Sequence, residues 1–221
     1  MTCSGLPRNV IVMITFDSLD AATRPDAPDW SEDAVRFLLQ QLEQGIGQRP
    51  FEGRVPYKGL EPFREEDAGF FFGREALTQQ LLRRIAVSTC LLVVGPSGCG
   101  KTSLVQAGLL AALKRDAIPS SARWRYAQMA PGRAPLQALG QAAAVLSGMP
   151  EAEHDLALHA PSDDARLLNW IKAGLKDDDA TERAVLVIDS FEEIFTQTES
   201  ESERQSVITQ LCTAIQQAGG L

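Results

Sequence analysis

The residues best suited to chemistry in this sequence form one glycine-rich segment. They are Gly95, Pro96, Ser97, Gly98, Cys99, Gly100, Lys101 and Thr102, which fit the pattern GxxxxGK[ST] at every defined position. Glycines permit backbone conformations that direct successive N–H groups toward phosphate oxygens. A helix that begins at the end of the segment would add the partial positive charge of its N-terminus. The segment therefore predicts a binding site for the phosphates of a nucleoside triphosphate.

The last residues of this segment have individual roles in such a site. We expect Lys101 to reach the β- and γ-phosphates and the Thr102 hydroxyl to ligate a magnesium ion, while Ser103 completes the cofactor-binding set. The alternative is a glycine-rich turn without a ligand. An apolar run over 89–94 and a helical pattern over 102–114 flank the segment, as a phosphate loop requires. We therefore favour the phosphate site, with ATP and Mg²⁺ as its ligands.

A second group of candidate residues follows another apolar run. Residues 184–188 predict a buried strand, and Asp189 at its end would lie at the carboxyl edge of a parallel sheet, beside the phosphate loop. There its carboxylate can hold the magnesium shell through water. Glu192 or Glu193 can orient or deprotonate an attacking water, which makes both of them candidate catalytic residues. The alternative is that the two glutamates cap the next helix, and the choice between them stays open.

Strands and helices alternate along the chain around these candidates. Apolar or β-branched runs predict strands over 89–94, 124–129 and 184–188. Helical periodicity predicts helices over 75–86, 102–114, 135–146, 156–175 and 203–217. Strands separated by helices imply right-handed βαβ units, so we expect an α/β fold with a parallel sheet between two helical layers.

The first fifty residues have a different pattern. Residues 9–16 predict a buried strand, 17–30 an acidic loop and 32–44 a helix, followed by a linker through Gly53. We expect residues 1–52 to form an N-terminal extension of unknown role and residues 53–221 to form the nucleotide-binding domain. Asp17 and Asp20 could form a metal pair, but a solvated acidic loop is the favoured interpretation.

Composition excludes several classes of protein. A net charge of −8 argues against a nucleic-acid binder, which needs a basic patch. No apolar stretch approaches the roughly 18 residues of a membrane helix. The four cysteines and two histidines lack the spacing of a metal site or a disulfide framework. We therefore expect a cytoplasmic protein that contacts neither membranes nor nucleic acids.

Four ordered blocks of the chain resemble the novel STAND NTPase family of signal-transduction ATPases, which is related to AAA+ and NACHT proteins. The blocks read PYKGLEPFREEDAGFFFGRE (56–75), GPSGCGKTSLVQAGLL (95–110), WRYAQMAPGRAPLQAL (124–139) and VLVIDSFEEIF (185–195). The resemblance implies a P-loop NTPase three-layer sandwich that switches between ATP- and ADP-bound states. It also implies that Arg74 lines the adenine pocket, the alternative being a surface position at a helix start.

Relatives in this family continue from the acidic strand into a further strand that senses the γ-phosphate, whereas this chain ends at Leu221. We therefore expect a C-terminally incomplete domain, a fragment of a larger sensor, in which ATP hydrolysis is in doubt. A non-hydrolysing nucleotide-binding scaffold is the alternative, and a P-loop kinase is disfavoured because no arginine-rich lid follows Asp189. Protein partners are expected but unidentified, and oligomerisation is possible.

The resemblance also predicts a gap in the sheet. In relatives the further strand lies between the acidic strand and the phosphate-loop strand. Its absence would leave backbone groups of residues 89–94 and 184–188 without partners. Either these strands pair directly or residues 9–16 fill the gap, or the chain is marginally stable and associates. We expect marginal stability, because a local repair must also recreate the correct register.

Overall fold

The structure is a computed structural model that describes residues 9–17, 58–150, 152, 163–177 and 183–218. The chain divides into two compact units, one of residues 1–18 and 62–221 and the other of residues 19–61. Within the described part of the second unit, the Glu61 N–H donates to the Lys58 carbonyl oxygen at 3.1 Å. The expected helix over 32–44, the linker, Cys3 and the two histidines lie outside the described residues.

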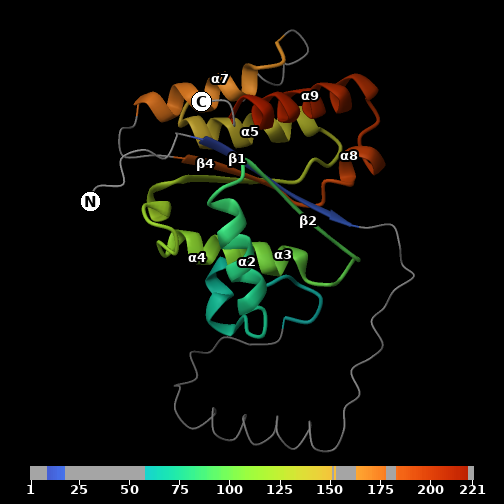
Figure 1. Cartoon of the computed structure of the whole chain (residues 1–221). Coiled ribbons are helices and arrows are strands. Elements are labelled where there is room, and N and C mark those ends of the chain that lie inside the picture. The colour runs from blue at the N-terminus through green and yellow to red at the C-terminus, as the bar shows by residue number, and fades with distance from the viewer. Residues whose placement is uncertain (1–8, 18–57, 151, 153–162, 178–182, 219–221) are drawn as a thin grey trace, which may run out of the picture. The chain divides into compact units, whose positions relative to one another are not determined.

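Four parallel strands form the sheet of the first unit (Figure 1). They are β1 (Asn9–Asp17), β2 (Cys90–Gly95), β3 (Arg125–Met129) and β4 (Arg183–Ile188), in the spatial order β2-β1-β4-β3. Every residue of β4 is buried, as expected for a strand covered on both faces. The predicted α/β fold with a parallel sheet is confirmed, and the strand boundaries differ from the predicted ones by a single residue at each end or less.

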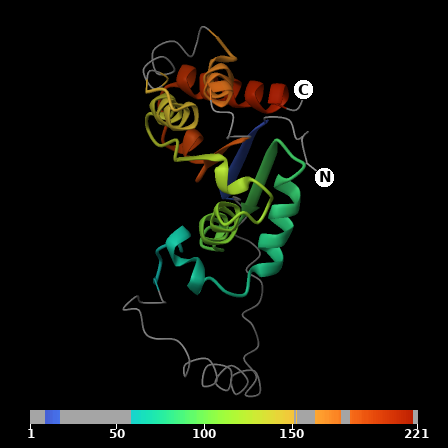
Figure 2. The ribbon, with the colours of Figure 1, turned by 90° about the vertical axis from the view of Figure 1, so that its left-hand side faces the viewer.

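Helices cover both faces of this sheet, which gives three layers (Figures 1 and 2). One face carries α2 (Glu75–Ile85) and a continuous helical segment formed by α3 (Lys101–Ser103), the π-helical η2 (Leu104–Leu110) and α4 (Ala111–Lys114). The other face carries α5 (Pro135–Ser147), α7 (Arg166–Asp177) and α9 (Glu201–Ala218). Short helical turns complete the described part: η1 (Glu65–Phe70), η3 (Ser121–Arg123) and α8 (Glu193–Thr196).

The sheet separates two hydrophobic cores, and β1 supplies side chains to both. Val10 and Val12 pack in the core beneath α5, α7 and α9. Ile11 and Met13 pack in the core beneath α2 and η2. Successive side chains of a strand point to opposite faces, so a strand that is apolar at every one of these positions must lie inside the sheet.

The N-terminal strand therefore fills the gap that the sequence predicts. Ile14 pairs with Leu92 of β2 on one side and with Ile188 of β4 on the other. The structure takes the alternative that we did not favour, and it joins residues from both sides of the expected boundary at residue 52 in one sheet. The physical reason for marginal stability, two facing strand edges without partners, is absent between β2 and β4. Stability and association themselves stay open to sedimentation and thermal unfolding.

Close helix packing explains a glycine inside the phosphate-loop helix. A Cβ atom added at Gly108 would lie 2.7 Å from the Thr78 hydroxyl of α2, so the two helices approach closely at this point. Segments of π-helix often occur near functional sites, and η2 begins three residues after Lys101.

The expected helix over 156–175 is described from Arg166 onward, as α7.

Candidate nucleotide-binding site

The glycine-rich loop joins the carboxyl end of β2 to the N-terminus of α3, as the sequence predicts. Gly98 and Gly100 have φ angles of 76° and 87°, a left-handed conformation that costs other residues free energy. Nothing lies within 4 Å of a Cβ atom added at either glycine. Backbone conformation and not lack of space therefore requires glycine at these positions. Residues 96–100 are exposed, so the loop is open to a ligand.

Lys101 and Cys99 occupy defined places around the loop. The Lys101 ammonium donates hydrogen bonds to the carbonyl oxygens of Gly95 and Pro96, at 3.0 Å each. A Cβ atom added at Gly95 would lie 2.8 Å from the Cys99 sulfur, so any larger residue at position 95 would displace the Cys99 side chain. The lysine thus lies across the start of the loop with its positive charge beside the turn.

Asp189 meets this loop from the end of β4. The Thr102 hydroxyl donates to Asp189 Oδ1 at 3.2 Å, across 87 residues of sequence. The Thr15 hydroxyl of β1 donates to the same carboxylate oxygen. Val185 and Val187 face the core beneath α2 and η2, so the two-residue period of a strand places Asp189 on the face that carries the loop helix. The sequence-based prediction that places Asp189 beside the phosphate loop agrees with this geometry.

The turn after Asp189 is held by the neighbouring strand. Ser190 has a φ of 62°, which is uncommon for a residue other than glycine. Its N–H donates to the Thr15 hydroxyl at 2.9 Å, and the Phe191 N–H donates to the Thr15 carbonyl oxygen at 3.0 Å. Thr15 was not among the site residues predicted from the sequence. The available signal was one hydroxyl near the carboxyl end of an otherwise apolar run, and its proximity to Asp189 could not be inferred before the position of the strand was known.

Glu192 and Glu193 lie in the turn and short helix that follow Asp189. Glu193 Oε2 accepts a hydrogen bond from the Gly132 N–H at 3.1 Å. The carbonyl oxygen of Gly132 in turn accepts from the Thr198 hydroxyl at 3.0 Å. Glu193 therefore helps to fix the loop after β3. Glu192 precedes the short helix α8 and is half-buried.

Ser103 has a structural partner. Its hydroxyl accepts from the Phe63 N–H at 3.1 Å and is buried. This contact ties the segment before η1 to the phosphate-loop helix. The Ser103 side chain therefore makes a structural contact, and any contact of Ser103 with a bound phosphate would come from its backbone.

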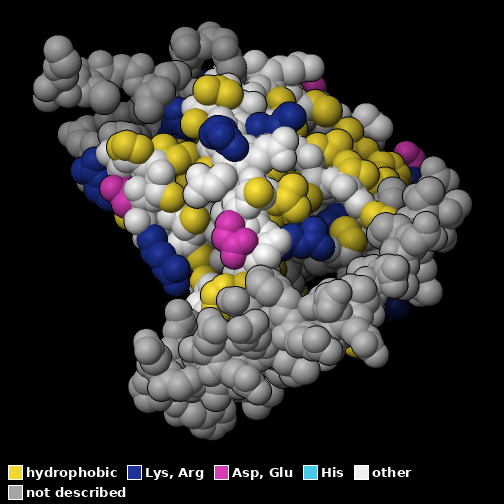
Figure 3. All heavy atoms as spheres, turned by 60° about the horizontal axis from the view of Figure 1, so that its bottom comes forward, with side chains coloured by type: hydrophobic (Ala, Val, Ile, Leu, Met, Phe, Trp, Pro, Cys, Tyr) yellow, Lys and Arg dark blue, Asp and Glu magenta, His cyan; other side chains and the backbone are white. Residues whose placement is uncertain are grey.

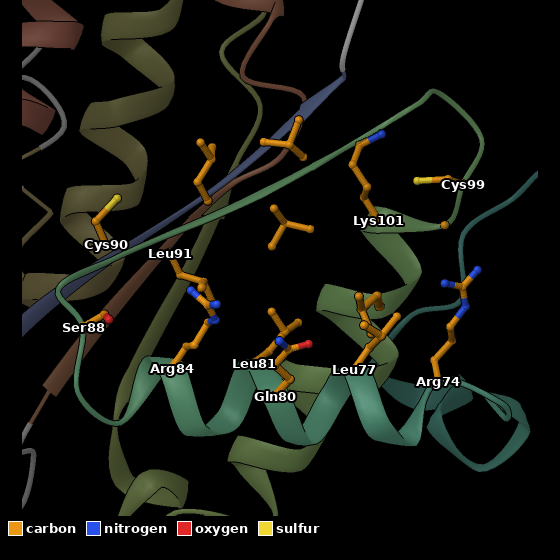
Figure 4. A pocket seen from close by; sticks show the side chains of 15 residues that line it. Arg74, Leu77, Gln80, Leu81, Arg84, Ser88, Cys90, Leu91, Cys99 and Lys101 are labelled. Atoms are coloured by element: carbon orange, nitrogen blue, oxygen red, sulfur yellow. The ribbon is translucent and has the colours of Figure 1, made fainter. Parts of the chain in front are cut away.

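A groove of about 470 Å³ continues from the loop along β2 and α2. Arg74 lies at the loop end of this groove, near Cys99 and Lys101, while Arg84 and Cys90 lie at the far end (Figure 4). Leu77 and Leu81 of α2 supply apolar lining between the two ends. The volume lies within the range of about 300–1,000 Å³ found for small-molecule sites. Leu77 is 38% exposed, so part of this apolar lining is open to a ligand.

The oxygen ligands around Asp189 suit a hard divalent cation. A threonine hydroxyl and one carboxylate leave most coordination positions to water and phosphate oxygens, which is how Mg²⁺ is usually held. Among the described residues, no group of three or more His, Cys, Asp or Glu side chains could hold a metal ion by itself. Thr102 and Asp189 therefore fit a metal that arrives with a phosphate ligand.

Basic side chains are scattered on the side of the molecule that carries α2 and α4. Figure 3 shows separate Lys and Arg side chains there, with apolar side chains between them. Lys114 is one of the basic residues of this layer, and it pairs with Glu65 at 2.7 Å. A continuous basic stripe, the usual footprint of nucleic-acid binding, is not seen on the described part of this face. In the described residues no helix is long and apolar enough to cross a membrane.

The parallel sheet, the glycine loop before α3 and the acidic end of β4 define a P-loop NTPase fold. The sequence profile of the family described as Novel STAND NTPase 1 matches residues 56–220. The chain belongs to this family, which confirms the resemblance, and the family is one of nucleotide-binding signalling modules. Comparisons with curated proteins and with solved structures returned no match. The strand β1 lies outside the matched residues.

Proposed function

We propose that this chain is the nucleotide-binding part of a STAND signalling switch, with ATP and Mg²⁺ as its ligands. One observation carries the proposal: the Thr102 hydroxyl oxygen lies 3.2 Å from Asp189 Oδ1, at the N-terminus of the loop helix. A hydroxyl and a carboxylate at this place are the pair that holds Mg²⁺ beside the phosphates in P-loop proteins. Bound Mg²⁺ would neutralise negative charge on the phosphates.

Lys101, Asp189 and Arg74 have separate tasks in this proposal. Lys101 exchanges the carbonyl oxygens of Gly95 and Pro96 for phosphate oxygens, which bear a full negative charge and make stronger hydrogen bonds. Asp189 holds the metal shell through water. The adenine base occupies the groove between α2 and β2, which Arg74 lines together with Leu77.

Hydrolysis, if the switch turns over, requires a base that can reach a water molecule. We propose that one of the two glutamates, Glu192 or Glu193, has this role; Glu193 also accepts a hydrogen bond from the Gly132 N–H. Phosphate release in the presence of Mg²⁺ and ATP, measured separately for Glu192→Gln and Glu193→Gln, identifies the base as the residue whose substitution abolishes it. A wild-type chain that binds ATP and releases no phosphate would instead favour the non-hydrolysing scaffold.

The binding proposal is tested by titrating a fluorescent ATP analogue against the wild-type chain and Lys101→Ala. The substitution removes a charged group at the protein surface and no core volume, so it should abolish measurable binding and leave the circular dichroism spectrum unchanged. Arg83→Ala is the matched control, because it removes an exposed positive charge on α2 that does not line the groove. Equal affinity of the wild-type chain and Lys101→Ala would show that the loop is not the site.

A further inference from the structure

The central strand β1 contributes a single polar side chain to an otherwise apolar run. Residues 10–16 read Val-Ile-Val-Met-Ile-Thr-Phe, and the side chain of Thr15 is 1% exposed. A buried hydroxyl is costly unless it is hydrogen-bonded. This one lies at the carboxyl end of β1, between the phosphate-loop strand and the acidic strand. It therefore lies at the edge of the sheet where the candidate ligands of the nucleotide gather.

The hydroxyl and the carbonyl oxygen of Thr15 both form hydrogen bonds with the acidic strand end. Its hydroxyl donates to Asp189 Oδ1 and accepts from the Ser190 N–H. Its carbonyl oxygen accepts from the Phe191 N–H. The same Asp189 oxygen accepts from the Thr102 hydroxyl of the loop helix. Asp189 is thus held from two sides, by the loop helix on one and by the N-terminal strand on the other.

We propose that Thr15 is a positioning residue of the magnesium–nucleotide site, so that β1 is a working part of that site although it lies outside the family-matched residues. This inference rests on the proposed function. A carboxylate fixed by two hydroxyl donors presents its second oxygen in one direction. A left-handed backbone conformation costs free energy at a residue other than glycine, so Ser190 keeps it only where its surroundings hold it. Thr15 supplies that hold, because it bonds the carboxylate before the turn and the two N–H groups within it.

The inference also links the N-terminal strand to the nucleotide. If β1 must be in place for Asp189 to be oriented, then bound Mg²⁺ and nucleotide must stabilise β1 in the sheet by the same free energy. Loss of β1 from the sheet would lower the affinity for the magnesium complex. The segment that precedes the family-matched region is thereby coupled to nucleotide binding.

The test compares Thr15→Val with Thr15→Ser. Valine removes the hydroxyl at nearly constant volume, and serine keeps it. Dissociation constants for the fluorescent ATP analogue are measured with Mg²⁺ and with EDTA. We expect Thr15→Val to weaken binding about tenfold with Mg²⁺ and less than about twofold with EDTA, since a hydrogen bond to a charged group is lost. Thr15→Ser should recover the wild-type magnesium dependence. Thr89→Val is the matched control, because it removes a hydroxyl just before β2, at the opposite end of the sheet.

A double-mutant cycle with Asp189→Asn locates the effect. Once the carboxylate charge is gone, Thr15→Val should have little further effect on magnesium-dependent binding. An equal loss with Mg²⁺ and with EDTA would show a merely structural role and would overturn the inference. Unchanged affinity in Thr15→Val would overturn it as well. No binding by the wild-type chain would instead be a failure of the proposed function.

Thr15→Val leaves the Ser190 N–H without its acceptor and could fail to fold, so hydrogen exchange on the wild-type chain provides a second measurement. The amides of Ser190 and Phe191 should exchange more slowly with Mg²⁺ and nucleotide than with nucleotide and EDTA. Exchange rates that are the same in both conditions would overturn the inference without any substitution.

Discussion

Thr15 and Asp189 share a hydrogen bond at the carboxyl ends of two adjacent parallel strands, although 174 residues separate them in the sequence. Their strands are in register, with Ile14 opposite Ile188, so Thr15 and Asp189 are the next pair. Both of their side chains point to the face of the sheet opposite to that of Ile14 and Ile188. Asp189 also accepts from Thr102 at 3.2 Å. Three segments from the beginning, the middle and the end of the chain therefore meet at one carboxylate.

Asp189→Asn should weaken nucleotide binding mainly when Mg²⁺ is present. The amide keeps an acceptor oxygen for Thr15 and Thr102 but loses the charge that attracts the metal shell. We expect at least about a tenfold rise in the dissociation constant with Mg²⁺, which corresponds to about 1.4 kcal/mol, and little change in EDTA. Isothermal titration in both buffers measures this. Asp164→Asn, at an exposed position, is the control, and a uniform loss in both buffers would indicate a structural role for Asp189.

Leu77→Ala and Arg74→Ala should each lower the affinity for ATP more than the affinity for inorganic tripolyphosphate. Both residues line the groove beside the loop, so their loss should affect the nucleoside and leave the phosphates in place. Removal of roughly 1 kcal/mol of apolar or stacking contact gives about a fivefold weaker interaction. Competition against the fluorescent analogue measures both ligands. Equal weakening for tripolyphosphate would mean that the groove does not hold the base.

Nucleotide should protect Cys99 from maleimide. Cys99 is exposed within the loop, whereas Cys212 is exposed on α9, on the other face of the sheet. Mg²⁺ and ATP should slow labelling of Cys99 severalfold and leave Cys212 unchanged, as measured by peptide mass spectrometry. Burial raises the pKa of Cys90, and the nearby charge of Cys212 adds to this, so Cys90 carries less reactive thiolate and should label slowly. Protection of Cys212 as well as Cys99 would point to a global change and not to a bound ligand in the loop.

The raised pKa of Cys90 also has a consequence for stability. The folded chain holds the thiol proton more tightly than the unfolded chain does. This contribution is complete below the ordinary thiol pKa of about 8.5 and is lost as pH rises through the folded value. Alkaline destabilisation above about pH 8.5 should therefore be smaller in Cys90→Ala than in the wild-type chain. Thermal unfolding across this pH range measures the difference between their slopes.

Gly174→Ala should destabilise the fold strongly. A Cβ atom at this position would lie 2.6 Å from the carbonyl carbon of Ser147 and closer still to its oxygen, so α7 could no longer approach the end of α5. Overpacking of this kind costs about 1–3 kcal/mol and occasionally more, since backbone atoms and not a flexible side chain must move. Denaturant unfolding measures the loss. Gly69→Ala is the control, because nothing lies within 4 Å of its added Cβ atom; similar losses in both variants would contradict the close crossing.

Local pattern was sufficient for most of the secondary structure and for the phosphate loop. The apolar runs became the strands β1, β2 and β4, although β2 ends the described strand order and leaves Leu92 and Val94 exposed. Periodicity in the amphipathic segments predicted α2, α5 and α9 within two residues at each end. The need for glycine at positions 98 and 100 was also predictable, because a backbone turn around phosphate depends on residues that are neighbours in the sequence. These features depend on residues that are close together in the sequence, so the spacing of residue types was sufficient to predict them.

What only the tertiary structure decided is which strands are neighbours. The order β2-β1-β4-β3 depends on pairings between residues more than fifty positions apart, and no local pattern specifies them. The sequence predicted strands on both sides of a gap and a spare apolar strand, yet it did not show that the spare strand fills the gap, as the structure does. Thr15 meets Asp189 through the same pairing, and Glu193 meets Gly132 after β3. The sequence determines which chemical groups a side chain carries, but the tertiary structure determines which groups from distant parts of the chain it contacts.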